Sequence, residues 1–147
     1  MPDQSDRKTW LGVLARAPQG RVATLLHALG DLPDVTILRQ PEAGSVMVQG
    51  RAGGTGNAFN LGEMTVTRCS LQLPCGTVGH GAVQGRSRSD ARTAALVDAL
   101  MQTDRAASVR AAVVNPIAEE LAARRQARAE KAAATKVEFF TLVRGED

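Results

Sequence analysis

Apolar residues recur with a helical period at the start of the chain. Trp10 and Leu14 fall on one face of a helix predicted over residues 5–17, and Pro18 ends it. A second apolar stripe predicts a helix over residues 21–29. Two short helices joined by a short connection predict a helical hairpin.

The middle of the chain changes to the two-residue period of β-strands. The first two strands are separated by Pro41–Gly44, which we interpret as a hairpin turn. In the third strand the alternation changes phase near Gly62, which predicts a β-bulge at this glycine. The four predicted strands cover residues 35–40, 45–51, 59–73 and 77–86.

Helical patterns return in the last third of the chain. Ser89 is the predicted N-cap of a helix over residues 89–103. A later helical pattern is expected to break before Pro116, so that a new helix covers residues 116–134 with Asn115 as its cap. That last helix has little apolar surface after its first two turns. We therefore expect its second half to be solvated or to contact another chain.

The order of these elements predicts the fold class. The strands are grouped together instead of alternating with helices, which predicts an α+β fold: an N-terminal helical hairpin, a central antiparallel sheet of about four strands, and C-terminal helices. The 147 residues allow one domain, residues 1–147. The chain has no apolar run long enough for a membrane span and begins with a polar, acidic segment, so we expect a cytoplasmic protein without membrane contact.

Composition adds two expectations. The chain has three Phe, one Trp and no Tyr, so its core must be built from aliphatic residues, and a partner surface is a natural way to complete it. The net charge of +3 suits an anionic ligand or an acidic partner. A nucleic-acid partner is disfavoured because single-strand binders need aromatic side chains among their basic residues.

A glycine-rich loop is the first candidate site. Consecutive glycines allow backbone N–H groups to turn towards an anion, and Arg51 supplies a guanidinium beside them. The candidate anion-binding residues are Arg51, Gly53, Gly54 and Gly56. Neither nucleotide-binding fingerprint is satisfied, so local sequence favours a plain tight loop.

Two further features predict close contacts. Gly79 and Gly81 leave one face of a strand bare, which allows close approach by a helix of the same chain or by a partner. Phe139 and Phe140 place two of the three phenylalanines near the C-terminus, where they are expected to dock on the chain's own sheet or on a neighbour.

A metal site is the weakest candidate. Cys69, Cys75 and His80 form a C-x5-C-x4-H pattern to which His27 could add a fourth ligand, but the spacing matches no known zinc motif. We therefore expect no metal and two reduced thiols. Local chemistry indicates a non-catalytic subunit or binding module. A stand-alone nucleotide- or nucleic-acid-binding module and a zinc-dependent enzyme are the alternatives.

Longer motifs carry a family resemblance. Their order and spacing resemble the PhnG family, the G subunit of the bacterial carbon–phosphorus lyase system for phosphonate degradation. The motifs are Gly50–Gly56, Phe59–Glu63, Thr67–Cys69, Lys131–Thr135, Val137–Thr141 and Val143–Glu146.

The resemblance implies an accessory subunit of a transferase complex in phosphonate catabolism. Such subunits assemble with the H, I and J subunits, and with the L subunit functionally. Together they support transfer of the ribose triphosphate unit of ATP to methylphosphonate with release of adenine, giving ribose 1-methylphosphonate 5-triphosphate. The resemblance implies no cofactor on this chain, ATP being a substrate of the complex, and it provides no catalytic residue to transfer. We expect Gly79, Gly81, Phe139 and Phe140 to pack on the I subunit.

Overall fold

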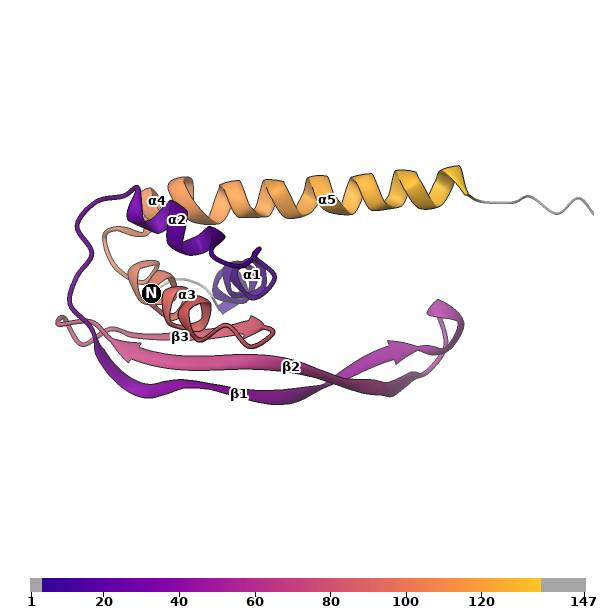
Figure 1. Ribbon diagram of the computed structural model, residues 1–147, viewed down its shortest axis with the longest axis horizontal. Coiled ribbons are helices and arrows are strands. Elements are labelled where there is room, and N and C mark those ends of the chain that lie inside the picture. The colour runs from indigo at the N-terminus through magenta and orange to yellow at the C-terminus, as the bar shows by residue number, and fades with distance from the viewer. Residues whose placement is uncertain (1–3, 136–147) are drawn as a thin grey trace, which may run out of the picture.

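The computed structural model describes residues 4–135 and confirms the α+β class (Figure 1). Three antiparallel strands form one sheet in the order β1-β2-β3, and helices cover one of its faces. The elements in chain order are α1 Gln4–Ala15, α2 Arg21–His27, β1 Thr36–Arg51, the 3-10 turn η1 Ala52–Gly54, β2 Ala58–Gln72, β3 Val78–Gln84, α3 Arg88–Leu100, α4 Ala106–Val109, the π-helical turn η2 Arg110–Val114 and α5 Asn115–Ala134.

The predicted turn at Pro41–Gly44 is wrong. β1 runs through this segment as one strand, which reduces the expected four strands to three. The pairing with β2 shifts register on both sides of Arg39, so an irregularity absorbs the proline. β1 is also an edge strand, where a proline that lacks an N–H group is tolerated.

The predicted bulge in β2 is confirmed beside Gly62. Val48 pairs with Gly62, whereas the next residue of β1, Gln49, pairs with Asn60. Leu61 is therefore the extra residue on β2. The inserted residue accounts for the phase change in the sequence because it turns every following side chain to the other face.

Small residues set the distance between α3 and the sheet. A Cβ atom on Gly79 would lie 2.0 Å from the carbonyl oxygen of Ala95, and one on Gly81 would lie 2.1 Å from that of Ala91. Only glycine permits such contact, so the bare strand face is filled by a helix of the same chain.

The core is aliphatic, as the composition predicts. Trp10 is its one large aromatic anchor among residues 4–135, and the surrounding side chains come from helices and from the helix-facing side of the sheet. The largest fully buried apolar side chains are Trp10, Leu14, Leu26, Leu71, Leu100, Ile117, Val22, Val97, Val109 and Val113.

Two helix starts differ from the predictions. Ser87, rather than Ser89, caps α3, because its Oγ accepts the N–H of Asp90 at 3.2 Å. Asn115 does not cap a new helix, since the chain passes from α4 through η2 into α5 without a break. A proline within a helix clashes with the carbonyl of the preceding turn, and the wider π-helical turn before Pro116 gives that carbonyl room. Within the described range, no helix is both long and apolar enough to cross a bilayer.

Candidate functional site

β1 and β2 continue past the end of β3 as a two-stranded arm, which reaches about as far as the end of α5 (Figure 1). β3 pairs with β2 only as far as Val66, so no third strand from residues 4–135 lies beside residues 45–65. We call residues 45–65 the arm. An isolated hairpin of this kind is marginal in water, so it needs a further contact to become rigid.

The arm carries most of the exposed large apolar side chains of the described residues. Leu61, the bulge residue, is 67% exposed and Met47 is 55% exposed. The ring of Phe59 lies against Gly50, whose Cβ position would be 3.7 Å from two ring carbons. Grouped apolar side chains on a projecting element are typical of a protein–protein contact. The exposed apolar side chains of the arm are Val46, Met47, Phe59 and Leu61.

The predicted anion-binding residues come together at the tip of the arm. The guanidinium of Arg51 donates from Nη1 to the carbonyl of Gly56 at 3.2 Å, and the N–H of Gly56 donates to Ala52 at 2.8 Å. Gly53 and Gly54 have φ of 60° and 83°, which L side chains rarely adopt. These bonds close the loop on itself and supply a structural reason for its glycines. Binding of an anion here stays a prediction.

The predicted interface residues have different outcomes. Gly79 and Gly81 turn their bare face to α3. The two glycines are therefore explained by packing within the chain, and a partner cannot use that face. This corrects the expectation that the glycine strand lies open to the I subunit. Phe139 and Phe140 lie outside the described residues, and their contact with a partner stays a prediction.

The cysteines and His80 do not converge. Cys69 pairs across the sheet with Gly81 and is buried on the α3 side, whereas His80, the next residue along β3 from Gly81, faces the other side. Burial raises the pKa of the Cys69 thiol, while a hydrogen bond with the hydroxyl of Thr77 lowers the pKa of the exposed Cys75 thiol. Among residues 4–135, no three His, Cys, Asp or Glu side chains are close enough to hold a metal ion.

A serine–histidine pair lies on the outer face of the sheet. Ser70 and His80 are cross-strand partners, and the Ser70 hydroxyl is 2.9 Å from Nδ1 of His80. A small hollow of about 220 Å³ beside them is also lined by Arg39 and Arg68. No carboxylate of residues 4–135 hydrogen-bonds to the imidazole, so within the described chain the pair lacks the third group that orients the base in a catalytic triad. Only the strand register reveals this pair.

The buried carboxylate of Asp98 is another feature that sequence reasoning missed. It accepts hydrogen bonds from Arg7 at 2.7 and 3.1 Å, from the backbone N–H of His80 at 2.8 Å, and from Trp10. The hydrogen bonds between Arg7 and Asp98, together with the negative charge of Asp98, raise the pKa of the Arg7 guanidinium. An aspartate within the apolar pattern of residues 94–101 is the signal that would have indicated it.

Comparison with known proteins identifies the family of this chain. The sequence model of the family described as phosphonate metabolism protein PhnG matches residues 5–145. The chain belongs to the PhnG family. It is 44% identical over 147 residues to the alpha-D-ribose 1-methylphosphonate 5-triphosphate synthase subunit PhnG of Rhizobium meliloti (strain 1021), covering 97% of this chain and 92% of that protein. Family membership confirms the resemblance carried by the motifs at residues 50–69 and 131–146.

Proposed function

We propose that this chain is an accessory, non-catalytic subunit of a ribose 1-methylphosphonate 5-triphosphate synthase in phosphonate metabolism. The observation that carries the proposal is the similarity to the Rhizobium meliloti subunit, which is 44% identical and extends over nearly the full length of both chains. The expected reaction of the complex transfers the ribose triphosphate unit of ATP to methylphosphonate and releases adenine.

The geometry of the described residues supports a subunit that acts through contacts. The arm holds exposed apolar side chains that a partner surface would cover, with Leu61 at its bulge. The Ser70–His80 pair, in contrast, has no orienting carboxylate among the described residues and lies on the outer face of the sheet. An arm with exposed apolar side chains, beside a serine–histidine pair without a third catalytic group in the described residues, indicates a subunit that binds partners and does not itself catalyse the reaction.

The finer assignment of partners is part of the same proposal. The partners are the H, I and J subunits of the carbon–phosphorus lyase core, with the L subunit acting functionally, in the cytoplasm. The arm and the tail residues Phe139 and Phe140 contact the I subunit. Changing both phenylalanines to Asp is expected to abolish co-purification with that subunit, and an intact complex would contradict the assignment of the tail.

Adenine release tests the function directly. The chain is co-expressed with its neighbouring phosphonate genes, and the purified complex is supplied with ATP and methylphosphonate. We expect adenine to be released by the complete complex, but neither by a complex that lacks this chain nor by the chain alone. Turnover by the isolated chain, or equal turnover without it, would contradict the proposal.

A further inference from the structure

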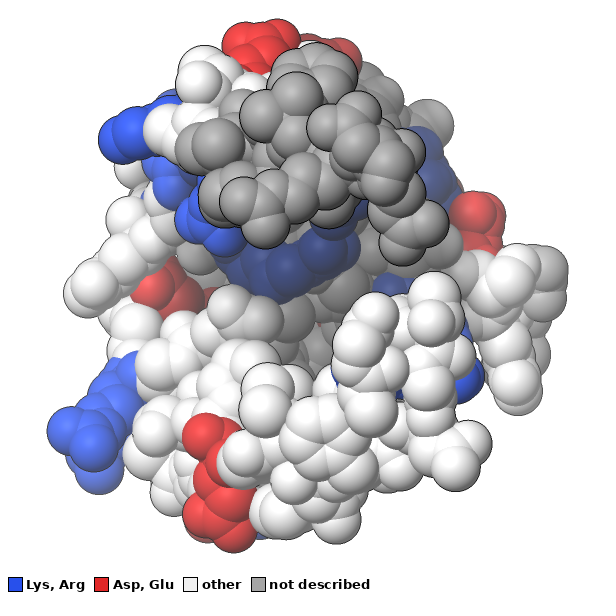
Figure 2. All heavy atoms as spheres, turned by 90° about the vertical axis from the view of Figure 1, so that its right-hand side faces the viewer, with Lys and Arg blue, Asp and Glu red and all other residues white. Residues whose placement is uncertain are grey.

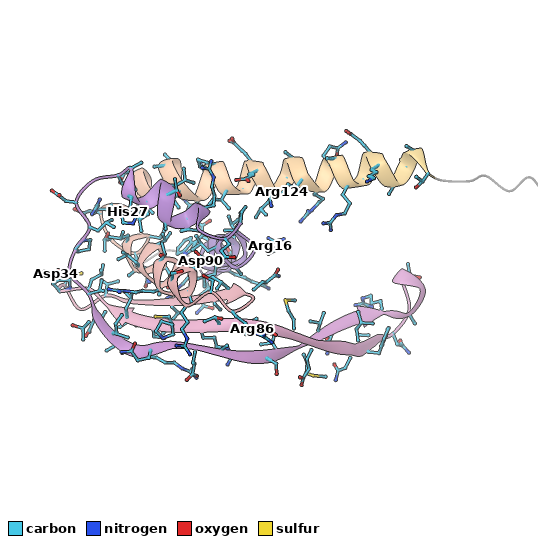
Figure 3. The ribbon with its side chains drawn as sticks, viewed as in Figure 1. Arg16, His27, Asp34, Arg86, Asp90 and Arg124 are labelled. Atoms are coloured by element: carbon cyan, nitrogen blue, oxygen red, sulfur yellow. The ribbon has the colours of Figure 1, made fainter. Side chains whose placement is uncertain are left out.

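Four arginines gather in a groove between the end of α1 and the middle of α5. The groove has a volume of about 330 Å³. Figure 3 shows Arg124 on the side of α5 that faces Arg16, and Figure 2 shows the basic side chains in the hollow between α5 and the arm. The residues that line the groove are Arg16, Gln84, Leu121, Arg124, Arg125 and Arg128, and none of them is acidic.

The α5 residues of the groove follow a helical stripe. Leu121, Arg124, Arg125 and Arg128 occupy positions i, i+3, i+4 and i+7, which lie on one face. Because α5 rises about 1.5 Å per residue, the arginines of this face, from Arg124 to Arg128, are spread along about 6 Å of the helix axis. The donors are thus spread in a row instead of converging on one point.

The positive charge of this row is largely uncompensated. Arg124 pairs with Glu120 at 2.9 Å, but that carboxylate also pairs with Arg21 at 3.2 Å. Arg125 and Arg128 make no ion pair with any residue of the described chain. Like charges held side by side repel one another, and a bound polyanion would relieve this repulsion.

Guanidinium groups are suited to phosphate oxygens. Each offers a planar fork of donors that binds two oxygens at once, and such charge-assisted bonds are stronger than neutral ones. Arg16 is already oriented for this role because its Nε donates to the carbonyl of Gly12 at 2.8 Å, leaving the terminal nitrogens for another acceptor. A row of guanidinium groups can bind several linked phosphates at once, so it suits an oligophosphate better than a single phosphate ion.

The groove continues into an apolar hollow. A second space of about 140 Å³ shares Arg16, Leu121 and Arg125 with the groove. Its other lining residues are apolar, namely Val13, Ala118 and Ala122. A ligand with a charged chain and an uncharged organic end would fill both parts.

We propose that this groove binds an organic oligophosphate, with its phosphate chain on the arginines and its organic end beside Leu121. The inference rests on the proposed function, because the named product of the relative's synthase carries a 5-triphosphate group. The size of the groove suits a small molecule, since small-molecule sites have volumes of about 300–1,000 Å³. An acidic segment of a partner protein is the rival occupant.

The test measures binding of inorganic tripolyphosphate by calorimetry, with the full-length chain and with the co-purified complex. The Arg125→Gln/Arg128→Gln variant removes two guanidinium groups, and we expect it to bind tripolyphosphate at least tenfold more weakly. Arg125→Lys/Arg128→Lys keeps the charge without the forks and should fall between the two. The control is Arg88→Gln/Arg92→Gln, which removes two exposed charges from α3 and should bind as the native chain does.

Three outcomes would overturn the proposal. The first is equal binding by the native chain and the Gln variant, or no saturable binding by either the chain or the complex. The second is a hexaglutamate peptide that binds as tightly as tripolyphosphate, which would assign the groove to an acidic protein segment. The third is loss of assembly in the Gln variant, which would make the groove a subunit interface. If assembly and adenine release need this chain while tripolyphosphate does not bind, only this inference fails.

Discussion

The indole Nε1 of Trp10 donates a 2.9 Å hydrogen bond to Oδ1 of Asp98, whose side chain has no exposed surface. Trp10 belongs to α1 and Asp98 to α3, and Arg7 and the backbone of His80 bind the same carboxylate. One buried charge thus joins α1, α3 and β3. Because every donor points at one group, its loss leaves several buried partners unsatisfied.

Asp98→Ala is expected to destabilise the protein by about 3–5 kcal/mol, the cost of breaking a buried charge pair. Asp98→Asn should lose less stability than Asp98→Ala, because the amide oxygen of Asn still accepts the hydrogen bond from Trp10. Denaturant unfolding, followed by the fluorescence of the single tryptophan, measures both. Asp34→Ala removes an exposed carboxylate and should change stability by less than about 0.5 kcal/mol. If Asp98→Ala lost no more stability than Asp34→Ala, the stabilising role of the hydrogen bonds to Asp98 would be contradicted.

Gly79→Ala is expected to cost about 3 kcal/mol or more, because its Cβ would meet the Ala95 carbonyl oxygen at 2.0 Å and α3 would have to move from the sheet. The matched control is Gly44→Ala, a strand glycine whose added Cβ would meet nothing within 4 Å. That change should leave stability equal or raise it by about 0.4–1 kcal/mol. Thermal unfolding separates the two, and similar melting temperatures would refute the close packing.

The two thiols should differ in reactivity. The exposed Cys75 has a lowered pKa, so more of it is thiolate near pH 8 than for a free cysteine, and it should react first with iodoacetamide. Cys69 is buried with a raised pKa and should react only on unfolding. Thr77→Val removes the hydrogen bond that lowers the Cys75 pKa, so the alkylation profile should move to higher pH. Mass spectrometry of the modified sites against pH measures this, and an unmoved profile would contradict the assigned cause.

Much of the fold is predictable because local signals and packing agree. The phase change near Gly62 correctly indicated the bulge at Leu61, since alternation records the face of each side chain. The turn predicted at Pro41 was wrong because proline disrupts a central strand but is tolerated in an edge strand. The sequence does not indicate which strand lies at the edge. Pro116 misled for a similar reason, because the π-helical turn that accommodates it has no signature in the sequence.

The candidate sites were predictable only where one segment contains them. Arg51 and Gly56 come together because they belong to one short loop. Ser70 and His80 meet only through strand register, and the arginine groove needs Arg16 brought to a helix that begins about one hundred residues later. Long-range contacts of this kind depend on the whole topology, so no local sequence pattern predicts them.

The arm provides the most direct test of the claim that this chain works as part of a larger assembly. Met47→Asp/Leu61→Asp places one charge on each face of the arm, at two exposed apolar side chains that do not belong to the core. The control, Leu38→Asp, adds a charge at another exposed position of β1 outside the arm. Circular dichroism and thermal unfolding first establish that all three proteins fold alike.

Native mass spectrometry of the co-expressed complex is the deciding measurement. We predict that the arm variant is missing from the assembly or is bound at least about thirtyfold more weakly, the loss typical of interface hot spots. Leu38→Asp should assemble as the native chain does. An arm variant that is fully incorporated, with unchanged affinity, would contradict the account.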